Sequence, residues 1–251
     1  MLALLGALRE EISGLRKGVL LEEVSTQQDY CLYRGKYRNK AVLLAQTGLG
    51  RERSERVTQF ILERYPVTAL VSLGFAGALT GESRIGDIIL CSTLYCGNGQ
   101  VNKKTRSENQ YHSDVSLVSR SLQYVGNTAT RLRQGKSVTV TRPVLKPEAK
   151  EALGKAFRAD IVDMESYWIA RVASVKQIPF LAVRAVSDTI QDSLLPFDQI
   201  LGSNGRWRWH KAVPYFLFHP EYLIKLFTLY RNAQQARKSL TIIIDHLVAN
   251  L

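Results

Sequence analysis

The chain has 251 residues, and its 34 Lys and Arg against 22 Asp and Glu give a formal net charge of +12. With 45% hydrophobic and 22% charged residues the composition is globular, which excludes a disordered chain and leaves room for one large α/β domain. Cys31, Cys91 and Cys96 form no CxxC pair, which argues against a disulfide framework or a zinc cluster and favours a reducing, cytoplasmic setting.

The first residues, MLALLGALREEI, are apolar for only eight positions and have neither a basic start nor a cleavage site. They are not expected to act as a signal peptide. Lys225 and Arg231 interrupt the most apolar stretch near the C-terminus, so the sequence predicts no membrane span.

Short apolar runs alternate with amphipathic stretches over the first 190 residues. The runs are LALLGAL at 2–8, AVLLAQTGLG at 41–50, ALVSLGFAGAL at 69–79, DIILCSTLYC at 87–96, ADIVDMES at 159–166 and PFLAVRAVSD at 179–188. Several are continuously apolar and end in Gly, Ser or Asp, which is typical of strands buried on both faces. Residues 52–65 and 166–177 are predicted helices, so the fold class is α/β with a central, mostly parallel or mixed sheet.

Two segments stand outside this alternation. Residues 97–136 are polar and basic, and we expect them to form a surface excursion without a core of its own. After the turn-rich sequence at 202–209, Pro220 suits the start of a helix, and apolar residues then recur at spacings of three and four. This pattern predicts one long helix or two shorter ones. We expect a main domain over 1–201 and a basic, amphipathic helical extension over 202–251.

Two glycine-containing sequences stand where buried strands should end. Residues 47–50 read TGLG before a predicted helix, so their backbone amides can approach an anion or a sugar, although a tight turn explains them equally well. Gly74, Ala76 and Gly77 leave room for a flat ligand against the backbone, with close strand-to-helix packing as the alternative.

Carboxylates are the second feature of the predicted strand ends. Glu11 follows the first strand, Asp163 and Glu165 interrupt VDMES, and Asp188 follows Ser187 in the last apolar run. Each of these residues could instead cap a helix or lie in its first turn, and we expect one of Asp163 and Glu165 to cap while the other is free. Carboxylates on opposite sides of a glycosidic bond are a recurring means of cleaving it, and three strand ends of one sheet bring Glu11, Glu165 and Asp188 together.

Taken in order, LGALREEI, TGLG, SLGFAGAL, GDIIL, VDMES and VRAVSD resemble the signature of the nucleoside phosphorylase and nucleosidase superfamily. The likeness covers about residues 1–200 and is strongest to the methylthioadenosine/S-adenosylhomocysteine nucleosidase branch. It implies a single α/β domain around a mixed sheet that partly closes like a barrel, assembled as dimers or larger oligomers. It also implies a purine nucleosidase or phosphorylase that uses no cofactor and binds an adenine nucleoside.

The resemblance implies a role for each matching residue. Glu11 matches the carboxylate that activates the attacking water. Glu165, with Met164 beside it, matches the pair that holds the ribose hydroxyls. Asp188 matches the residue that protonates or hydrogen-bonds the purine N7, with Ser187 in support.

Departures from the family pattern bear on whether water or phosphate is the nucleophile. Ala76 and Gly77 match backbone along the base, and Phe75 belongs to the same substrate-binding stretch. Phosphate-using relatives carry Arg where Ser72 stands and Ser or Thr where Phe75 stands, so the loss of both anion donors favours water. The residues following TGLG that could supply a replacement cation, and with it a possible anion site, are Arg51 and Arg53.

The C-terminal extension resembles a different branch, the hopanoid-associated phosphorylases, which implies adenine removal from a lipid nucleoside as an alternative. A basic, apolar helix could also contact an anionic membrane surface, although packing on the domain or at a subunit interface is the more general expectation.

The +12 charge also suggests an alternative that is not an enzyme, a nucleic-acid-binding protein. Charge alone is weak evidence for it, and we expect no nucleic-acid partner. The histidines are scattered without ligand spacing, so no metal is expected either.

Overall fold

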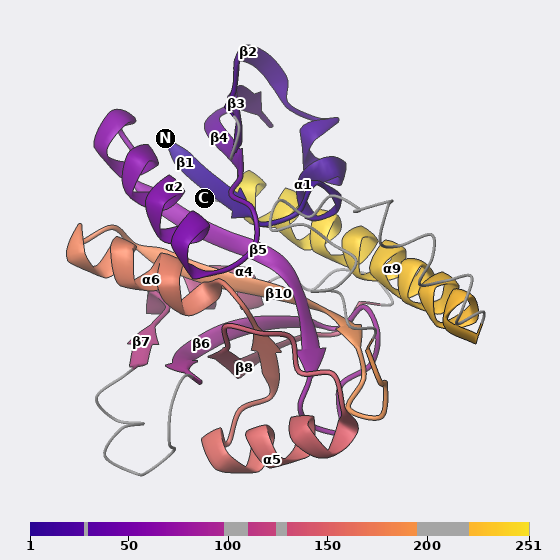
Figure 1. The fold of residues 1–251 in the computed structure, drawn as a ribbon. Helices are drawn as coiled ribbons and strands as arrows, with labels where there is room; N and C mark the ends of the chain where they lie inside the picture. Colours follow the sequence, from indigo (N-terminus) through magenta and orange to yellow (C-terminus); the bar gives the residue numbers. More distant parts are fainter. Residues whose placement is uncertain (28–29, 98–109, 124–129, 195–220, 251) are drawn as a thin grey trace.

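The apolar runs of the sequence form a central mixed sheet (Figure 1). The structure, a computed structural model, describes residues 1–27, 30–97, 110–123, 130–194 and 221–250, with residues 221–224 described by their helical backbone only. In chain order the helices and strands are β1 Leu2–Gly6, α1 Arg9–Arg16, β2 Leu20–Thr26, β3 Cys31–Tyr37, β4 Lys40–Gln46, α2 Arg51–Arg64, β5 Ala69–Ala78, β6 Ile88–Cys96, β7 Gln110–His112, α4 Val115–Leu122, β8 Leu132–Thr139, α5 Pro147–Phe157, β9 Ile161–Asp163, α6 Ser166–Val175, β10 Phe180–Asp188 and α9 Glu221–Asn250.

Part of the sheet closes on itself. Its strand order is β10-β6-β8-β9-β5-β1-β4-β3-β2, and β10 also pairs with β5. Strands β5, β10, β6, β8 and β9 therefore form a closed ring, while β1, β4, β3 and β2 extend from it as an open sheet. Both parallel pairs, such as β5 with β10, and antiparallel pairs, such as β6 with β10, occur. The predicted mixed and partly barrel-like α/β sheet is confirmed.

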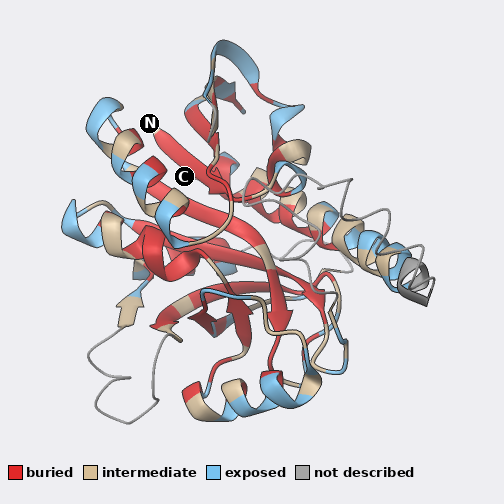
Figure 2. Ribbon diagram, in the orientation of Figure 1, coloured by how far each residue is buried: buried red, intermediate tan, exposed pale blue. Residues whose placement is uncertain are grey.

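Helices cover both faces of this sheet (Figures 1 and 2). On one side α2 and α6 pack together and supply Val57 and Ile169 to one core cluster. On the other side α1, α4 and α9 supply Ile12, Leu117 and Ile244 to a second cluster. Strands β1 and β10 are buried along their whole length because both of their faces are covered, which explains their unbroken apolar sequences.

The described parts of residues 97–136 join the sheet and supply buried side chains to the core, so the expected surface excursion is wrong for them. Strand β7 pairs with β6, and α4 buries Leu117 and Val118 while Val115 stays exposed. Asp114 caps α4 by accepting a hydrogen bond from the Leu117 amide at 2.9 Å. A short amphipathic helix among polar residues left too few apolar positions for its period to be read from the sequence. Residues 98–109 and 124–129 lie outside the described residues.

The C-terminal extension contains one continuous helix, α9, with two different halves. Towards its C-terminus the helix buries Leu240, Ile244 and Leu247 in the core shared with α1 and the sheet. Earlier in the helix Phe227 is 68% exposed and Tyr230 is 61% exposed. The apolar residues spaced three and four apart therefore pack on the domain only in the second half of the helix.

Polar contacts tie the same half to the sheet. Asp245 accepts hydrogen bonds from the Tyr37 hydroxyl at 2.8 Å and from Arg38 Nη2 at 2.6 Å. Pro220, the turn at 202–209 and the predicted boundary after residue 201 lie outside the described residues. Among the helices that are described, none has both the length and the apolar character needed to cross a bilayer.

The packing of α9 predicts a large stability effect for Ile244→Ala. The side chain is fully buried, so its removal leaves a cavity and should lower the free energy of unfolding by about 2–5 kcal/mol. Urea denaturation measures this change, with Phe227→Ala on the exposed half as the matched control, expected within about 0.5 kcal/mol of the parent. Equal effects of the two substitutions would contradict a core role for the second half of α9.

Candidate active site

Glu11 lies in the first turn of α1, not at the end of a strand as predicted, because β1 already ends at Gly6. Its side chain is 5% exposed, and each carboxylate oxygen accepts a backbone hydrogen bond at 2.8 Å, from Leu8 and from Phe75. A Cβ on Gly74 would come within 2.7 Å of Glu11 Oε1, so the glycine of SLGF leaves room for this carboxylate. Burial raises the pKa of Glu11, and the two backbone amides oppose that rise.

Asp163 is the residue of VDMES whose side chain bonds the backbone at the start of the following helix, while Glu165, at the N-cap position, makes no cap bond. Asp163 Oδ1 accepts hydrogen bonds from the amides of Glu165 and Ser166, both at 3.1 Å, and from the Thr139 hydroxyl at 2.7 Å. Its Oδ2 accepts from Arg184 Nε at 3.2 Å. With both oxygens occupied, Asp163 is a fully bonded internal group, and the expectation that one of the two carboxylates caps the helix is confirmed.

Arg184 supplies the buried positive charge of the site, a role that the sequence did not indicate. It lies within β10, is 2% exposed, and pairs with Asp163. Its Nη2 also donates to Ser72 Oγ at 2.8 Å and its Nη1 to the Ser72 carbonyl at 3.0 Å. An arginine in a continuously apolar strand was the available signal, because such a residue must find a buried partner.

Glu165 is the carboxylate that stays available. Its Oε1 accepts a hydrogen bond from the Gly50 amide at 2.8 Å, so the TGLG turn contacts a side chain of the site. Gly48 and Gly50 have φ angles of 79° and 85°, which favour glycine and explain the motif. Burial, with the charge of Glu11 as the next cause, raises the pKa of Glu165 to about 8.

Asp188 ends β10 beside the last glycine of SLGFAGAL. It is 5% exposed, and a Cβ on Gly77 would come within 2.7 Å of its Oδ2. Ser187 Oγ donates to Asp188 Oδ1 at 2.9 Å, and Lys150 Nζ donates to Oδ2 at 2.5 Å. Residues 189–192 form a turn, so neither Ser187 nor Asp188 caps a helix within the described residues. The sequence analysis missed Lys150.

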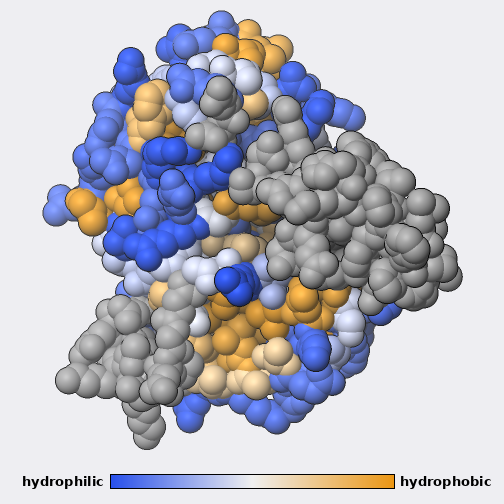
Figure 3. All heavy atoms as spheres, in the orientation of Figure 1, coloured by the Kyte–Doolittle hydropathy of each residue, from blue (hydrophilic) through white to orange (hydrophobic). Residues whose placement is uncertain are grey.

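The other predicted substrate-binding residues, for the base and the ribose, lie at the same strand ends. Ala76 is buried in β5, while Phe75 and Met164 are partly buried. Figure 3 shows hydrophobic surface over the carboxyl-terminal parts of β5 and β8. An apolar surface of this kind beside buried carboxylates suits a flat, partly polar ligand.

Arg51 contacts Trp168 and Glu55, not Glu11, Glu165 or Asp188. Its guanidinium lies over the Trp168 ring, 4.5 Å from the ring centroid, and its Nε is 3.4 Å from Glu55 Oε2. Arg53 is half-buried in the same helix and has interactions of its own. An anion-binding role for either residue stays a prediction.

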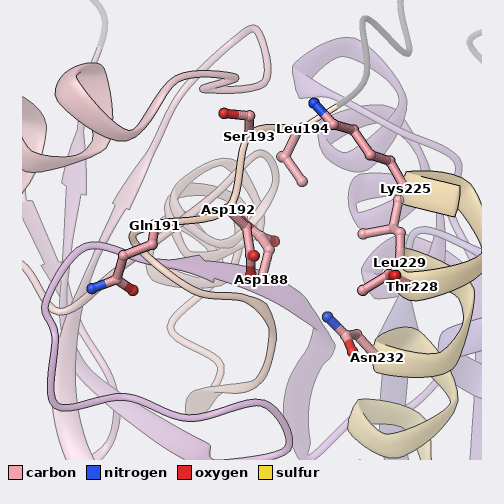
Figure 4. Close-up of a pocket in the computed structure, with 9 residues that line it drawn as sticks. All are labelled: Asp188, Gln191, Asp192, Ser193, Leu194, Lys225, Thr228, Leu229 and Asn232. Carbon is pink, nitrogen blue, oxygen red and sulfur yellow. The ribbon is translucent and has the colours of Figure 1, made fainter. Parts of the chain in front are cut away.

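A cavity of about 340 Å³ adjoins Asp188 (Figure 4). Residues of the turn after β10 form one wall, and Lys225, Thr228, Leu229 and Asn232 of α9 form the other. The helical extension therefore takes part in the surroundings of Asp188. In the part of the chain that the structure describes, no three His, Cys, Asp or Glu side chains gather as a metal site would require.

Known proteins resemble this chain in sequence and in fold. A family model described as the phosphorylase superfamily matches residues 2–202. The 5′-methylthioadenosine/S-adenosylhomocysteine nucleosidase of Listeria monocytogenes is 25% identical over 214 residues, which cover 80% of this chain and 91% of that relative.

Two solved structures show the same fold. The nucleosidase of that name from Neisseria meningitidis, in complex with methylthio-immucillin-A, has a TM-score of 0.78 at 19% identity and covers 100% of this chain and 99% of its own. Futalosine hydrolase of Helicobacter pylori has a TM-score of 0.72 at 21% identity, with 97% of each chain covered. The likeness extends over the described strands and helices that carry Glu11, Glu165 and Asp188.

Proposed function

Because this chain belongs to the phosphorylase superfamily, we propose that it is a purine nucleosidase of the methylthioadenosine/S-adenosylhomocysteine type, which hydrolyses the N-glycosidic bond of a 5′-substituted adenine nucleoside and releases adenine. The observation that carries the proposal is the placement of two carboxylates along β5, Glu11 beside Gly74 and Asp188 beside Gly77. Glu165 is close enough to Glu11 for the Glu11 charge to raise its pKa, so a sugar and a water there would meet two carboxylates.

Each carboxylate has a separate task in this reaction. Glu11, whose pKa is raised by burial, takes a proton from the attacking water. Glu165 accepts hydrogen bonds from the ribose hydroxyls, and its negative charge stabilises the oxocarbenium-like ribosyl group of the transition state. Asp188, oriented by Ser187, donates a proton to N7 of the departing adenine. Met164 packs beside the ribose.

The charge balance of the site favours water over phosphate as the nucleophile. Three buried carboxylates, Glu11, Asp163 and Glu165, surround one buried guanidinium, that of Arg184. A phosphate dianion needs a cation to bind it, and Arg184 is already paired with Asp163, whereas an attacking water needs none. Ser72 stands where phosphate-using relatives carry an arginine. Its hydroxyl accepts a hydrogen bond from Arg184 and supplies no positive charge for a phosphate. Phosphorolysis with Arg51 or Arg53 as the anion partner is the alternative.

The base would lie against the end of β5. Gly77 and Ala76 present backbone there, and Phe75 offers a partly buried ring at the same strand end. Flat apolar contact combined with an acid at N7 would bind adenine.

The remaining features of the proposal concern the whole protein. We take residues 1–201 as the catalytic domain and residues 202–251 as its helical extension, and we expect a cytoplasmic homo-oligomer without a cofactor. The exposed Phe227 and Tyr230, with cations nearby in the sequence, support contact of α9 with an anionic membrane surface.

Adenine release tests the proposed activity. Methylthioadenosine, S-adenosylhomocysteine and a long-chain 5′-alkyl adenosine are each incubated with the protein, with and without phosphate, and adenine is measured by chromatography. We expect release from the two thioethers without phosphate, and its loss in Asp188→Asn, which keeps the shape of the side chain but has no proton to give as an acid.

The other outcomes lead elsewhere. Release only with phosphate would replace hydrolysis by phosphorolysis, and release only from the long-chain compound would indicate a lipid nucleoside. No release from any of them would remove the activity proposed here.

A further inference from the structure

Lys150 is a fully buried lysine that contacts the catalytic acid. It lies in α5 and its side chain is 0% exposed. Gly154, one turn later on the same face of the helix, lets α5 approach β5 closely, since a Cβ there would come within 2.7 Å of the Leu79 carbonyl oxygen. The close approach brings the ammonium of Lys150 to the carboxyl ends of β5 and β10.

All three N–H groups of Lys150 have acceptors. Nζ donates to Asp188 Oδ2 at 2.5 Å, to the Thr189 carbonyl at 2.7 Å and to the Asp192 carbonyl at 3.0 Å. The turn also has hydrogen bonds of its own, because Asp192 Oδ2 accepts from the Thr189 amide at 2.7 Å and from its hydroxyl at 2.9 Å. Buried ion pairs contribute little net stability compared with apolar groups, so folding alone gives no reason for an ammonium here.

The chemistry of the proposed function does give one. Adenine is a poor leaving group unless N7 receives a proton, and Asp188 in contact with an ammonium is half of an ion pair. We propose that Lys150 is a positioning residue that holds Asp188 towards the base and supplies the proton that Asp188 passes to the departing adenine. This inference rests on the proposed nucleosidase function.

The protons of the step balance. As the bond between the ribosyl carbon and the base breaks, its electron pair goes to the base, and N7 takes a proton by way of Asp188. Because Asp188 is ionised in its pair with Lys150, this proton comes from Lys150 Nζ, which transfers it to Asp188 and becomes a neutral amine. Water adds to the ribosyl carbon and gives its proton to Glu11. Glu11 then releases a proton to solvent and Lys150 regains one, so water and nucleoside yield adenine and the free sugar.

Two substrates with the same sugar and different leaving groups test the inference. Methylthioadenosine needs a proton on its base, whereas the 4-nitrophenyl 5-methylthio-β-D-riboside loses a phenolate that needs none. We expect Lys150→Met to lower kcat for methylthioadenosine by about 10- to 100-fold, part of the usual contribution of a general acid, and to change the nitrophenyl reaction by less than about threefold. Lys150→Arg should show the same split, because a guanidinium keeps the ion pair but does not release its proton.

Control variants separate this role from a structural one. Lys155→Met, on the exposed face of the same helix, should leave both reactions unchanged. In an Asp188→Asn background Lys150→Met should have almost no further effect on kcat for methylthioadenosine, because the lysine acts through Asp188. This double variant has no unpaired buried carboxylate at position 188, so it remains informative if Lys150→Met alone does not fold.

The contrary results are equally specific. Equal losses with both substrates would reduce Lys150 to a structural residue, and full activity of Lys150→Arg on methylthioadenosine would exclude it as the proton source. If the parent protein releases no adenine from methylthioadenosine, the proposed function itself fails, which is a different outcome from a Lys150 variant that retains activity.

Discussion

Replacing Glu11 with glutamine should lower kcat for adenine release by about 10²- to 10⁴-fold, the usual contribution of a general base. Glutamine keeps the size of the side chain and can still accept one backbone hydrogen bond, but it cannot take a proton from water. The amide nitrogen of glutamine would also face the N–H of Leu8 or of Phe75, which now point at the two carboxylate oxygens. KM should change less than kcat, because the lost interaction belongs to the transition state.

Initial rates with methylthioadenosine at several concentrations measure both constants. Glu10→Gln is the matched control, since Glu10 lies in the same first turn of α1 but is exposed, and it should retain the activity of the parent. A Glu11→Gln variant that kept its kcat and lost only affinity would assign Glu11 to binding and leave the water without a base.

The buried strands and the sites at their ends could be predicted because the information is local. A strand buried on both faces is continuously apolar, and a charged residue at its end is visible against that background. Glu165 and Asp188 stand in this way after β9 and at the end of β10, and they are buried beside the Gly50 amide before α2 and beside Gly77 of β5, respectively. Glu11 was recognised as well, although it belongs to a helix and not to a strand end.

Roles that depend on contacts distant in sequence could not be predicted. Which of Asp163 and Glu165 is bonded internally shows only in contacts such as that of Asp163 with Arg184, 21 residues along the chain. Lys150 belongs to KPEAKEALGKAF, which has the appearance of an ordinary basic amphipathic helix. The one local signal is that Lys150 shares its buried face with Gly154 and Phe157, where a solvated lysine would not be expected.

Glu165→Gln should make the protein more stable at alkaline pH while it lowers activity. Burial, followed by the neighbouring Glu11, raises the pKa of Glu165 from 4.5 to about 8 in the folded protein. Between these values the folded chain holds a proton that the unfolded chain has lost, so stability falls as pH rises from about 4.5 to about 8. Glutamine has no such proton to lose. The variant should match the parent near pH 5 and exceed its free energy of unfolding by a few kcal/mol, as an order of magnitude, at pH 9.

Activity should change in the opposite direction. Without the negative charge beside the ribosyl cation, kcat should fall by about 10²- to 10³-fold, although glutamine can still accept the Gly50 hydrogen bond that Glu165 accepts. Urea denaturation at pH 5.5, 7 and 9 measures the stability difference, and Glu63→Gln on the exposed end of α2 serves as the control without the alkaline gain. A stability difference independent of pH would mean that Glu165 is already ionised throughout this range. A gain in stability together with a loss of kcat would show that the buried charge destabilises the fold and is nevertheless required by the reaction, because the same desolvation that raises the pKa of Glu165 strengthens its attraction for a ribosyl cation.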